Sequence, residues 1–463
     1  LSLHDNILTG IIPLNLGFCS QLQYLYLHDN YFTGTIPYTF ANLTQMIQIF
    51  LVKNYFTGSI PSIFQNYTQL QSFAVNSNQF TGSIPSYLLD QSELVLVELS
   101  NNQLDGSFSA PMYSNWYQIK ALSCSTNYLT GAFPIGLDNS PVLQYLNLSD
   151  NILTSTIPMG LGGMVKLNFL YLGLNLFSGS LPDVFNDLPN LSYLFLDSNL
   201  LTGTIPGSLG YASLLQSVNL SSNHLTGTIP TSLSQLSALS VLLLQDNALT
   251  GNIYVFNSAV FINLNTVQLS DNQLTGTLPD ALGKLAGLHV FAAVSNCFTG
   301  SLPESLCDSL SLLTLSLDGM QSASACQQQL FPAALEGKIV AQSLYSIRSP
   351  ITGGIPECLF RMPNLTTLHL SGNGLTGSLS SSMTVSVSLS DLSLSHNKLE
   401  GRIPSVVLQR QWSTLDLSYN RFTGTLEHNT LAQYPANTSI YLGNNRLSGG
   451  VPGGFLHLTT VDV

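Results

Sequence analysis

Large apolar residues, mostly leucine, recur along this chain in a fixed order about every 24 residues. In one copy the order is Leu143-x-x-Leu146-x-Leu148, and an asparagine, Asn151, follows three residues later. Side chains alternate between the two faces of a strand, so Leu146 and Leu148 are predicted to point inward from one short strand. Most copies continue with a turn of the form Leu-Thr-Gly-x-Ile-Pro. The pattern therefore predicts one short strand and one turn in each repeat.

The asparagine defines a register of nineteen positions along the chain. It stands at Asn6, Asn30, Asn54, Asn78, Asn102, Asn127, Asn151, Asn175, Asn199, Asn223, Asn247, Asn272, Asn296, Asn373, Asn397, Asn420 and Asn445. Two further positions of the register, Met320 and Ser349, carry other residues and lie 29 residues apart instead of 24. We interpret the irregular segment, about residues 321–349, as an insertion that makes one coil five residues longer than the others.

A single repeat cannot enclose its own leucines. Neighbouring coils must stack to close a common core, in which each buried leucine contributes about 1.5–3 kcal/mol. The asparagine at the end of each strand is predicted to turn inward, where its amide satisfies backbone groups of the adjacent coil. Glycine permits the bend on the flank and proline ends it. The sequence predicts one continuous solenoid over residues 1–463.

The phrases LTGTIP, FTGSIP and LSGGVP resemble the plant-type leucine-rich repeat (LRR), which occurs in extracellular receptor and defence proteins and in some algal and protist surface proteins. The resemblance covers essentially the whole chain. It implies an α/β, mostly β solenoid, a single right-handed superhelix of about 19 coils. It further implies a parallel sheet on the concave face, a second short sheet along the Thr-Gly flank, and irregular or 3-10 structure on the convex side. It implies no particular ligand, because fold alone does not set function.

Members of that family carry cysteine-containing caps at both ends of the solenoid, and this sequence shows none. Its first residues already fit a strand, and HLTTVDV at its end begins another. A solenoid with bare ends exposes its core. We therefore expect an internal portion of a longer protein, or ends that pack against partners.

Composition narrows the function further. Only 8% of the residues are charged, the net charge is −12, and the pI is about 4.8. Nucleic acid and anionic lipid require a basic surface, which this composition does not supply. No run of 18 or more apolar residues occurs, so no membrane span is predicted.

Motifs of catalysis are absent from the sequence. There is no His-Glu-x-x-His, no phosphate-binding glycine loop and no nucleophile elbow, so we predict no enzyme and no cofactor. His4 and His28 stand at equivalent positions of adjacent repeats, each followed by aspartate. They could form a weak metal-binding or pH-sensitive pair, but a solvated surface is the favoured interpretation, and no metal site is predicted.

Four of the six cysteines flank the irregular segment: Cys297, Cys307, Cys326 and Cys358. We expect one or two disulfides among them, which tether that segment to neighbouring coils. Three connectivities are open, and we favour one that joins Cys326 to the thirteenth coil. A metal site is disfavoured because no Cys-x-x-Cys spacing occurs. Cys124 takes an inward leucine position and Cys19 lies about four coils away, so both are predicted to be free thiols.

Disulfides indicate an oxidising compartment, and glycosylation sequons agree with secretion. The Asn-x-Ser/Thr sequence occurs at Asn42, Asn66, Asn147, Asn190, Asn219, Asn364 and Asn437. Such sequences also arise easily within this repeat. We predict an extracellular or cell-surface glycoprotein.

The concave face is predicted to carry the residues six, four and two positions before each register position. None of these is lysine or arginine, and several are aromatic: Tyr24, Tyr26, Phe50, Tyr145, Phe169, Tyr171, Tyr193 and Phe195. Aromatic side chains on a rigid sheet are typical of binding surfaces, although aromatics also favour strands for structural reasons. We predict that these residues contact a ligand or partner.

Two classes of function compete. The first is a non-enzymatic binding module, a receptor-like or adhesive ectodomain for a protein or a neutral carbohydrate. The resemblance implies a pair of concave arginines in peptide receptors, and this chain lacks it. The second class is a structural glycoprotein rod that assembles into a fibre, coat or appendage. A minor alternative is ice binding by threonine pairs such as Thr202 and Thr204 or Thr226 and Thr228, which recur at coil spacing on the flank.

Two of the sequons bear on the size of the partner. Asn147 and Asn219 lie four positions before their register asparagines, so they are predicted to face outward and to bracket the aromatics from Tyr145 to Phe195. Glycans at both positions would wall a site about three coils wide, roughly 15 Å at strand spacing. A narrow partner is then expected, such as a loop, a glycan chain or an extended segment.

Overall fold

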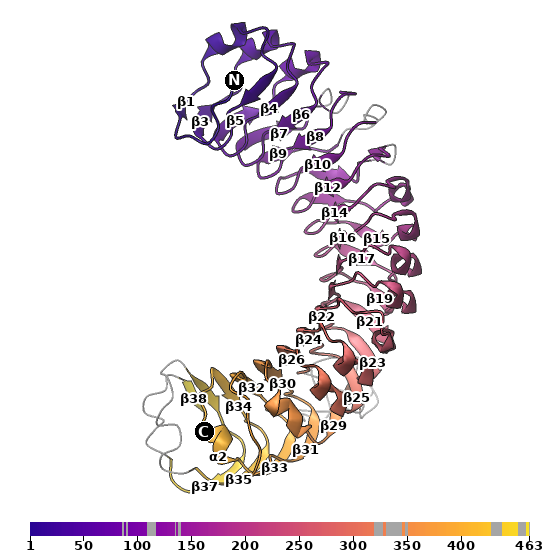
Figure 1. Cartoon of the computed structure of the whole chain (residues 1–463), viewed down its shortest axis with the longest axis vertical. Coiled ribbons are helices and arrows are strands. Elements are labelled where there is room, and N and C mark those ends of the chain that lie inside the picture. The colour runs from indigo at the N-terminus through magenta and orange to yellow at the C-terminus, as the bar shows by residue number, and fades with distance from the viewer. Residues whose placement is uncertain are drawn as a thin grey trace, which may run out of the picture. The chain divides into compact units, whose positions relative to one another are not determined.

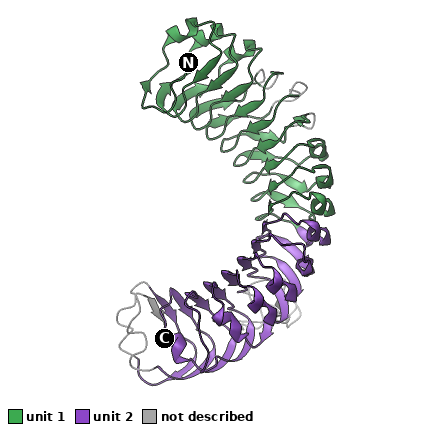
Figure 2. Ribbon diagram, in the orientation of Figure 1, with its two compact units in different colours: residues 1–225 green, residues 226–463 purple. Residues whose placement is uncertain are grey.

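The computed structural model describes most of the chain. The residues outside the description are 86, 87, 89, 90, 109–116, 135, 138, 139, 319–326, 330–344, 348–350, 427–437, 452–459 and 463. For strands 327–329, 345–347 and 460–462 only the backbone is described. The chain forms two compact units, residues 1–225 and 226–463, which Figure 2 shows in different colours.

Each unit is built around a parallel main sheet to which every coil adds one short strand (Figure 1). In unit 1 the strands are β2 (Tyr24–Tyr26), β4 (Gln48–Phe50), β6 (Ser72–Ala74), β8 (Leu96–Glu98), β10 (Ala121–Ser123), β12 (Tyr145–Asn147), β14 (Phe169–Tyr171), β16 (Tyr193–Phe195) and β18 (Ser217–Asn219), paired in that order. The middle residue of each strand is buried, as Leu146 and Leu170 illustrate. The leucine spacing thus predicted these strands correctly.

The main sheet of unit 2 follows the same plan. Its strands are β20 (Val241–Leu243), β22 (Thr266–Gln268), β24 (Val290–Ala292), β26 (Thr314–Ser316), β30 (Thr367–His369), β32 (Asp391–Ser393), β34 (Thr414–Asp416), β36 (Ser439–Tyr441) and β38 (Thr460–Asp462), again in pairing order. We call the side of either main sheet that points away from the core the open face.

A second set of short parallel strands runs along the Thr-Gly flank, as predicted. In unit 1 these are β1 (Thr9–Gly10), β3 (Tyr31–Gly34), β5 (Tyr55–Ser59), β7 (Gln79–Ser83), β9 (Gln103–Asp105), β11 (Thr130–Ala132), β13 (Ile152–Thr154), β15 (Ser178–Ser180) and β17 (Leu200–Thr202). In unit 2 they are β19 (Thr226–Thr228), β21 (Ala248–Gly251), β23 (Gln273–Thr277), β25 (Cys297–Ser301), β29 (Ile351–Gly353), β31 (Gly374–Ser378), β33 (Lys398–Arg402), β35 (Arg421–Thr425) and β37 (Arg446–Ser448).

Short helical turns complete the coils on the remaining side. They are the 3-10 helices η1 (Leu14–Phe18), η2 (Tyr38–Asn42), η3 (Ser62–Asn66), η5 (Met159–Gly163), η6 (Phe185–Asp187), η7 (Gly207–Tyr211), η8 (Thr231–Gln235), η9 (Tyr254–Asn257), η10 (Asp280–Lys284), η11 (Glu304–Asp308) and η14 (Glu357–Arg361), and α2 (Ser405–Leu408). The proline of the repeat explains where most of them begin. Pro37, for example, has φ −61° and its carbonyl accepts the first helical hydrogen bond, from Phe40 at 3.0 Å.

The register asparagine connects the coils through hydrogen bonds inside the core. Asn54 Nδ2 donates to the carbonyls of Leu27 at 3.0 Å and Leu51 at 3.2 Å, and its Oδ1 accepts from the N–H of Phe32 at 2.9 Å. Two of these partners belong to the preceding coil. The same arrangement recurs at most register positions, including Asn199 and Asn296. The predicted role of this residue is confirmed.

The flank glycine is required for two reasons, which Gly58 shows. Its φ is +77°, a left-handed conformation that strains any residue with a Cβ. A Cβ built there would also lie 2.9 Å from Cγ2 of Thr35 in the preceding coil. In several repeats the hydroxyl of the threonine beside this glycine donates a hydrogen bond to the preceding coil. Thr250, for example, donates to the carbonyl of Gly227 at 3.3 Å. The Thr-Gly pair therefore lets adjacent coils approach closely.

The irregular segment does not form a coil of its own with five extra residues, so that prediction is wrong; it is inserted within a single coil, between β26 and β29. In the main sheet β26 pairs directly with β30, Leu315 facing Leu368. On the flank β25 pairs directly with β29. The chain therefore leaves the stack after β26 and returns at β29, and in the described part of the segment between them β27 (Gln327–Gln329) pairs antiparallel with β28 (Tyr345–Ile347). The register positions Met320 and Ser349 lie outside the described residues.

A disulfide spans this excursion, as predicted. Cys307 on η11 bonds Cys358 on η14, with their Cα atoms 5.7 Å apart. Cys297 is also disulfide-bonded, whereas Cys326 lies outside the described residues. Cys19 is an exposed free thiol and Cys124 a buried one, which confirms both predictions.

Candidate binding surface

Five aromatic side chains form a continuous group on the open face of unit 1, which we call the aromatic patch: Tyr145, Phe169, Tyr171, Tyr193 and Phe195. They lie on β12, β14 and β16, which are consecutive strands (Figure 1). The ring centroids of Phe169 and Tyr193 are 4.9 Å apart in a stacked arrangement, and those of Tyr171 and Phe195 are 5.1 Å apart, edge to face. All five side chains are half-buried. The structure thus brings together the aromatic residues predicted from these three repeats.

Polar groups at the edges of the patch fix some of these rings. The hydroxyl of Tyr193 donates to Oε1 of Gln216 at 3.0 Å, and Nδ2 of Asn147 donates to the hydroxyl of Tyr145 at 3.3 Å. Burial raises the pKa of Tyr171, and the neighbouring Tyr145 and Tyr193 raise it further. The hydroxyl of Tyr171 therefore stays protonated and uncharged at neutral pH.

A carboxylate that the aromatic pattern did not indicate borders the patch. Asp197 follows β16 and lies beside Gly173, where a Cβ would come within 2.7 Å of its Oδ1. Burial raises the pKa of this carboxyl, and a hydrogen bond to its own backbone partly offsets the effect. Its signal in the sequence was available, because Asp197 lies two positions before Asn199 and so belongs to the open face.

A second aromatic cluster lies on the coils that end at Asn30 and Asn54. Tyr26 contacts Phe50 with centroids 5.3 Å apart and lies 6.3 Å from Tyr24, which is 42% exposed. The structure adds His28 to this cluster, with its ring 6.2 Å from Phe50. This second cluster thus brings together Tyr24, Tyr26 and Phe50. It lies on β2 and β4 and is separate from the aromatic patch.

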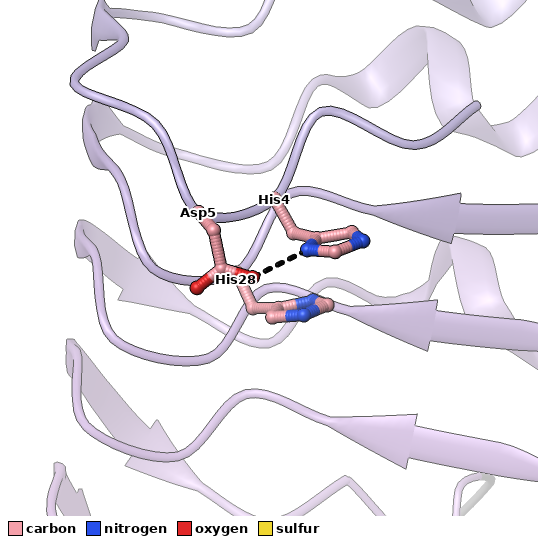
Figure 3. A group of neighbouring side chains, drawn as sticks. All are labelled: His4, Asp5 and His28. Atoms are coloured by element: carbon pink, nitrogen blue, oxygen red, sulfur yellow. Dashed lines mark hydrogen bonds and ion pairs between the residues drawn. The ribbon is translucent and has the colours of Figure 1, made fainter.

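Within the described residues, one group of side chains offers three potential metal ligands close together: His4, Asp5 and His28 (Figure 3). The two imidazoles stack with centroids 4.4 Å apart, and Nδ1 of His4 lies 2.6 Å from Oδ2 of Asp5. Burial lowers the pKa of His28, and the charge of His4 lowers it further. A neutral imidazole is the form that binds metals.

Two acidic positions of the open face have environments that the sequence did not reveal. Burial raises the pKa of Glu98 on β8 to about 7, although a hydrogen bond with Ser123 opposes the shift. In unit 2, burial raises the pKa of Asp318 to about 6, and His369 lies 3.5 Å from it. The same imidazole also forms an ion pair with Asp391, with Nε2 3.0 Å from Oδ1, and this carboxylate raises the pKa of His369. The open face therefore carries carboxylates in both units and, at its strand positions, no lysine or arginine.

Comparison with known proteins identifies the repeat. Profiles described as leucine-rich repeat match residues 141–201 and, in shorter pieces, 21–43, 214–236, 263–285, 364–385 and 388–409. Receptor-like protein 35 of Arabidopsis thaliana is 32% identical over 136 residues, 28% of this chain. The ectodomain of the plant membrane receptor kinase GASSHO1/SCHENGEN3 from Arabidopsis thaliana, solved with CASPARIAN STRIP INTEGRITY FACTOR 2, is 30% identical with a TM-score of 0.80. That match covers 99% of this chain and 54% of the ectodomain. The chain carries leucine-rich repeats and has the solenoid fold of plant receptor ectodomains.

A further structure extends the likeness of this LRR chain to receptor ectodomains. The Arabidopsis receptor kinase HAESA, in complex with the peptide hormone IDA and the co-receptor SERK1, is 26% identical with a TM-score of 0.80, over 98% of this chain and 75% of that one. The chain spans only 14% of the length of Receptor-like protein 35 and 17% of Receptor-like protein 32. In the described part of the chain no helix is both long enough and apolar enough to cross a bilayer.

The structure places six of the seven sequons of this LRR chain; Asn437 lies outside the described residues. Asn42 and Asn66 are exposed at the ends of η2 and η3. Asn190 and Asn364 donate through Nδ2 to backbone carbonyls of the preceding coil, at 2.8 Å in both cases. Asn147 and Asn219 lie on the open face, and each accepts a hydrogen bond from the serine two residues later. Glycosylation of these residues remains a prediction.

Proposed function

We propose that this chain is part of an extracellular, receptor-like protein and binds an extended segment of a partner protein on the open face of unit 1. The curated relatives are named receptor-like proteins, and HAESA was solved with a peptide hormone. The disulfide between Cys307 and Cys358 fits an oxidising compartment. No motif for catalysis is present in the sequence.

The aromatic patch is the observation that carries this proposal. Its five rings contact one another across three consecutive strands, so they form a single apolar surface on a rigid support. Aromatic side chains lose little conformational entropy on binding and are enriched among the residues that dominate interface energies. Stacked coils prevent the rings from collapsing into the core, because the inward positions are already filled by Leu146, Leu170 and Leu194.

Charge indicates the chemistry of the partner. Asp197 borders the patch, and the strand positions of the open face carry no lysine or arginine. A partner with free carboxylates at this point would meet only like charge. Lysine or arginine side chains of a partner can instead pair with Asp197 and lie over the tyrosine and phenylalanine rings. We therefore favour a segment that combines a basic residue with apolar ones over an acidic or a carbohydrate ligand.

Selection from a randomised linear peptide library on the immobilised chain tests this function. We expect enriched peptides to carry lysine or arginine next to aromatic or aliphatic residues, and to lose binding to the Tyr171→Ala/Phe195→Ala variant. The matched control is Tyr31→Ala/Tyr55→Ala, which removes a stacked aromatic pair on the flank, 6.0 Å between centroids. Peptides that bind the patch variant as well as the wild type would place the binding surface elsewhere.

A further inference from the structure

Two adjacent coils present His4, Asp5 and His28 at one point on the open face of unit 1. The coils are held in register there, because the N–H of Asp5 donates to the carbonyl of His28 at 3.1 Å and Ser2 pairs with Tyr26. Equivalent positions in parallel coils lie directly above one another. The imidazole of His4 therefore lies one strand spacing from that of His28. The two rings are nearly parallel, with 5° between their planes (Figure 3).

One nitrogen of this group lacks a partner. Nδ1 of His28 is buried and makes no hydrogen bond within the described residues. Buried polar atoms are nearly always paired, so an orphan of this kind calls for an explanation such as an ion. The ring of His28 has little freedom to turn away, since Tyr26 and Phe50 contact it with centroids 6.3 Å and 6.2 Å away.

The charges around the group also suit a cation. The carboxylate of Asp5 lies beside His4 and is exposed, and Asp29 forms an ion pair with Lys53 at 3.1 Å. The charge of Lys53 is therefore already neutralised by Asp29. Two imidazoles and one carboxylate form the donor set of borderline transition metals such as Zn²⁺, whereas Ca²⁺ and Mg²⁺ require more oxygen ligands than this site offers.

We propose that His4, Asp5 and His28 bind one Zn²⁺-class transition-metal ion, which joins two adjacent coils and keeps a coordination position open to solvent or to a ligand. The three donor atoms lie within 4.8 Å of one another. Tetrahedral coordination at a Zn–N distance near 2.0 Å brings donors to about 3.3 Å from each other. The stacked rings direct their in-plane lone pairs in parallel, so this geometry requires His4 to rotate out of the stack and Asp5 to rotate with it; both side chains are exposed.

Titration of the chain with Zn²⁺ by calorimetry, and with Co²⁺ followed by visible absorption, tests the site. We expect one high-affinity ion per chain and a Co²⁺ spectrum typical of four-coordination. His4→Gln and His28→Gln should each weaken binding by at least about tenfold, because loss even of an outer-shell partner of a metal ligand has that effect. Asp5→Asn should weaken it too, and asparagine tolerates the left-handed backbone that Asp5 adopts at φ 56°.

The matched control is His224→Gln, which removes an exposed histidine from another coil and should leave the stoichiometry and affinity unchanged. The proposal is overturned if no stoichiometric ion binds, or if His4→Gln and His28→Gln bind Zn²⁺ as the wild type does. Circular dichroism of the variants verifies that they fold. None of these results depends on a partner of the aromatic patch, so the two proposals fail separately.

Discussion

At the scale of the residue, the asparagine of the register is the most demanding position in the repeat. Asn296 is fully buried and serves four backbone groups: the carbonyls of Leu269, Ala293 and Val294 and the N–H of Leu274. No apolar residue of similar size offers both donors and an acceptor. The sequence predicted this role because the asparagine recurs where leucine spacing ends each strand.

We expect Asn296→Ala to lower the free energy of unfolding of unit 2 by about 2–4 kcal/mol, since it leaves several buried backbone groups unpaired. Asn6→Ala is the matched control. Asn6 is exposed and, among the described residues, its amide bonds the carbonyls of Leu3 and His4 alone, so about 1 kcal/mol or less is expected there. Guanidinium unfolding followed by circular dichroism measures both. Equal effects of the two substitutions would refute the role assigned to the buried amide.

Glu98 makes stability depend on pH at the same scale. Its pKa in the folded chain is about 7 against an ordinary value of 4.5, so the folded state binds the proton more tightly than the unfolded state. The stabilisation is complete below about pH 4.5 and is lost as the pH rises through 7. Glu98→Gln should remove this part of the pH dependence and raise stability at pH 8 by about 1 kcal/mol, a value reduced for partial solvent exposure. Parallel stability curves from pH 4.5 to 8 for wild type and variant would contradict the assignment.

At the scale of the element, the strands were predictable and the excursion was not. Three leucines precede Met320 at the expected spacing, Leu312, Leu315 and Leu317, and β26 forms there. Before Ser349 the same spacing selects Ala341, Leu344 and Ser346, which cannot fill a layer of the core. The register positions alone suggested a coil here, but a coil also requires three large apolar residues before its register position. The register alone therefore does not prove that a coil exists.

The disulfide that spans the excursion should contribute measurably to the stability of unit 2. Cys307 and Cys358 are 51 residues apart, and closing a loop of that length stabilises by about 4 kcal/mol in the chain-entropy model. The Cys307→Ser/Cys358→Ser variant, and wild type under reduction, should show a lowered thermal midpoint. Cys19→Ser is the control, because that thiol is free and exposed. An unchanged midpoint in the double variant would show that the stacked coils hold without the bond.

At the scale of the whole molecule, the sequence predicts which residues lie on the open face of each unit but not how deeply they are buried. Aromatics at positions six and four before the register asparagine were predicted to be outward, and the structure places Tyr145, Phe169 and Phe195 there. The carboxylates were equally readable, since Asp197, Asp318 and Asp416 occupy outward positions. Their burial was not readable, because it depends on which side chains the neighbouring coils bring beside them.

The affinity of a selected peptide for wild type and for the Tyr171→Ala/Phe195→Ala variant tests the central claim most directly. We expect the double substitution to weaken binding by about 2 kcal/mol or more per ring, a hot-spot value, and to leave the unfolding midpoint of unit 1 nearly unchanged. Tyr31→Ala/Tyr55→Ala should alter neither quantity. Unchanged peptide affinity together with a lowered unfolding midpoint would show that the aromatic patch is structural and that the partner binds elsewhere.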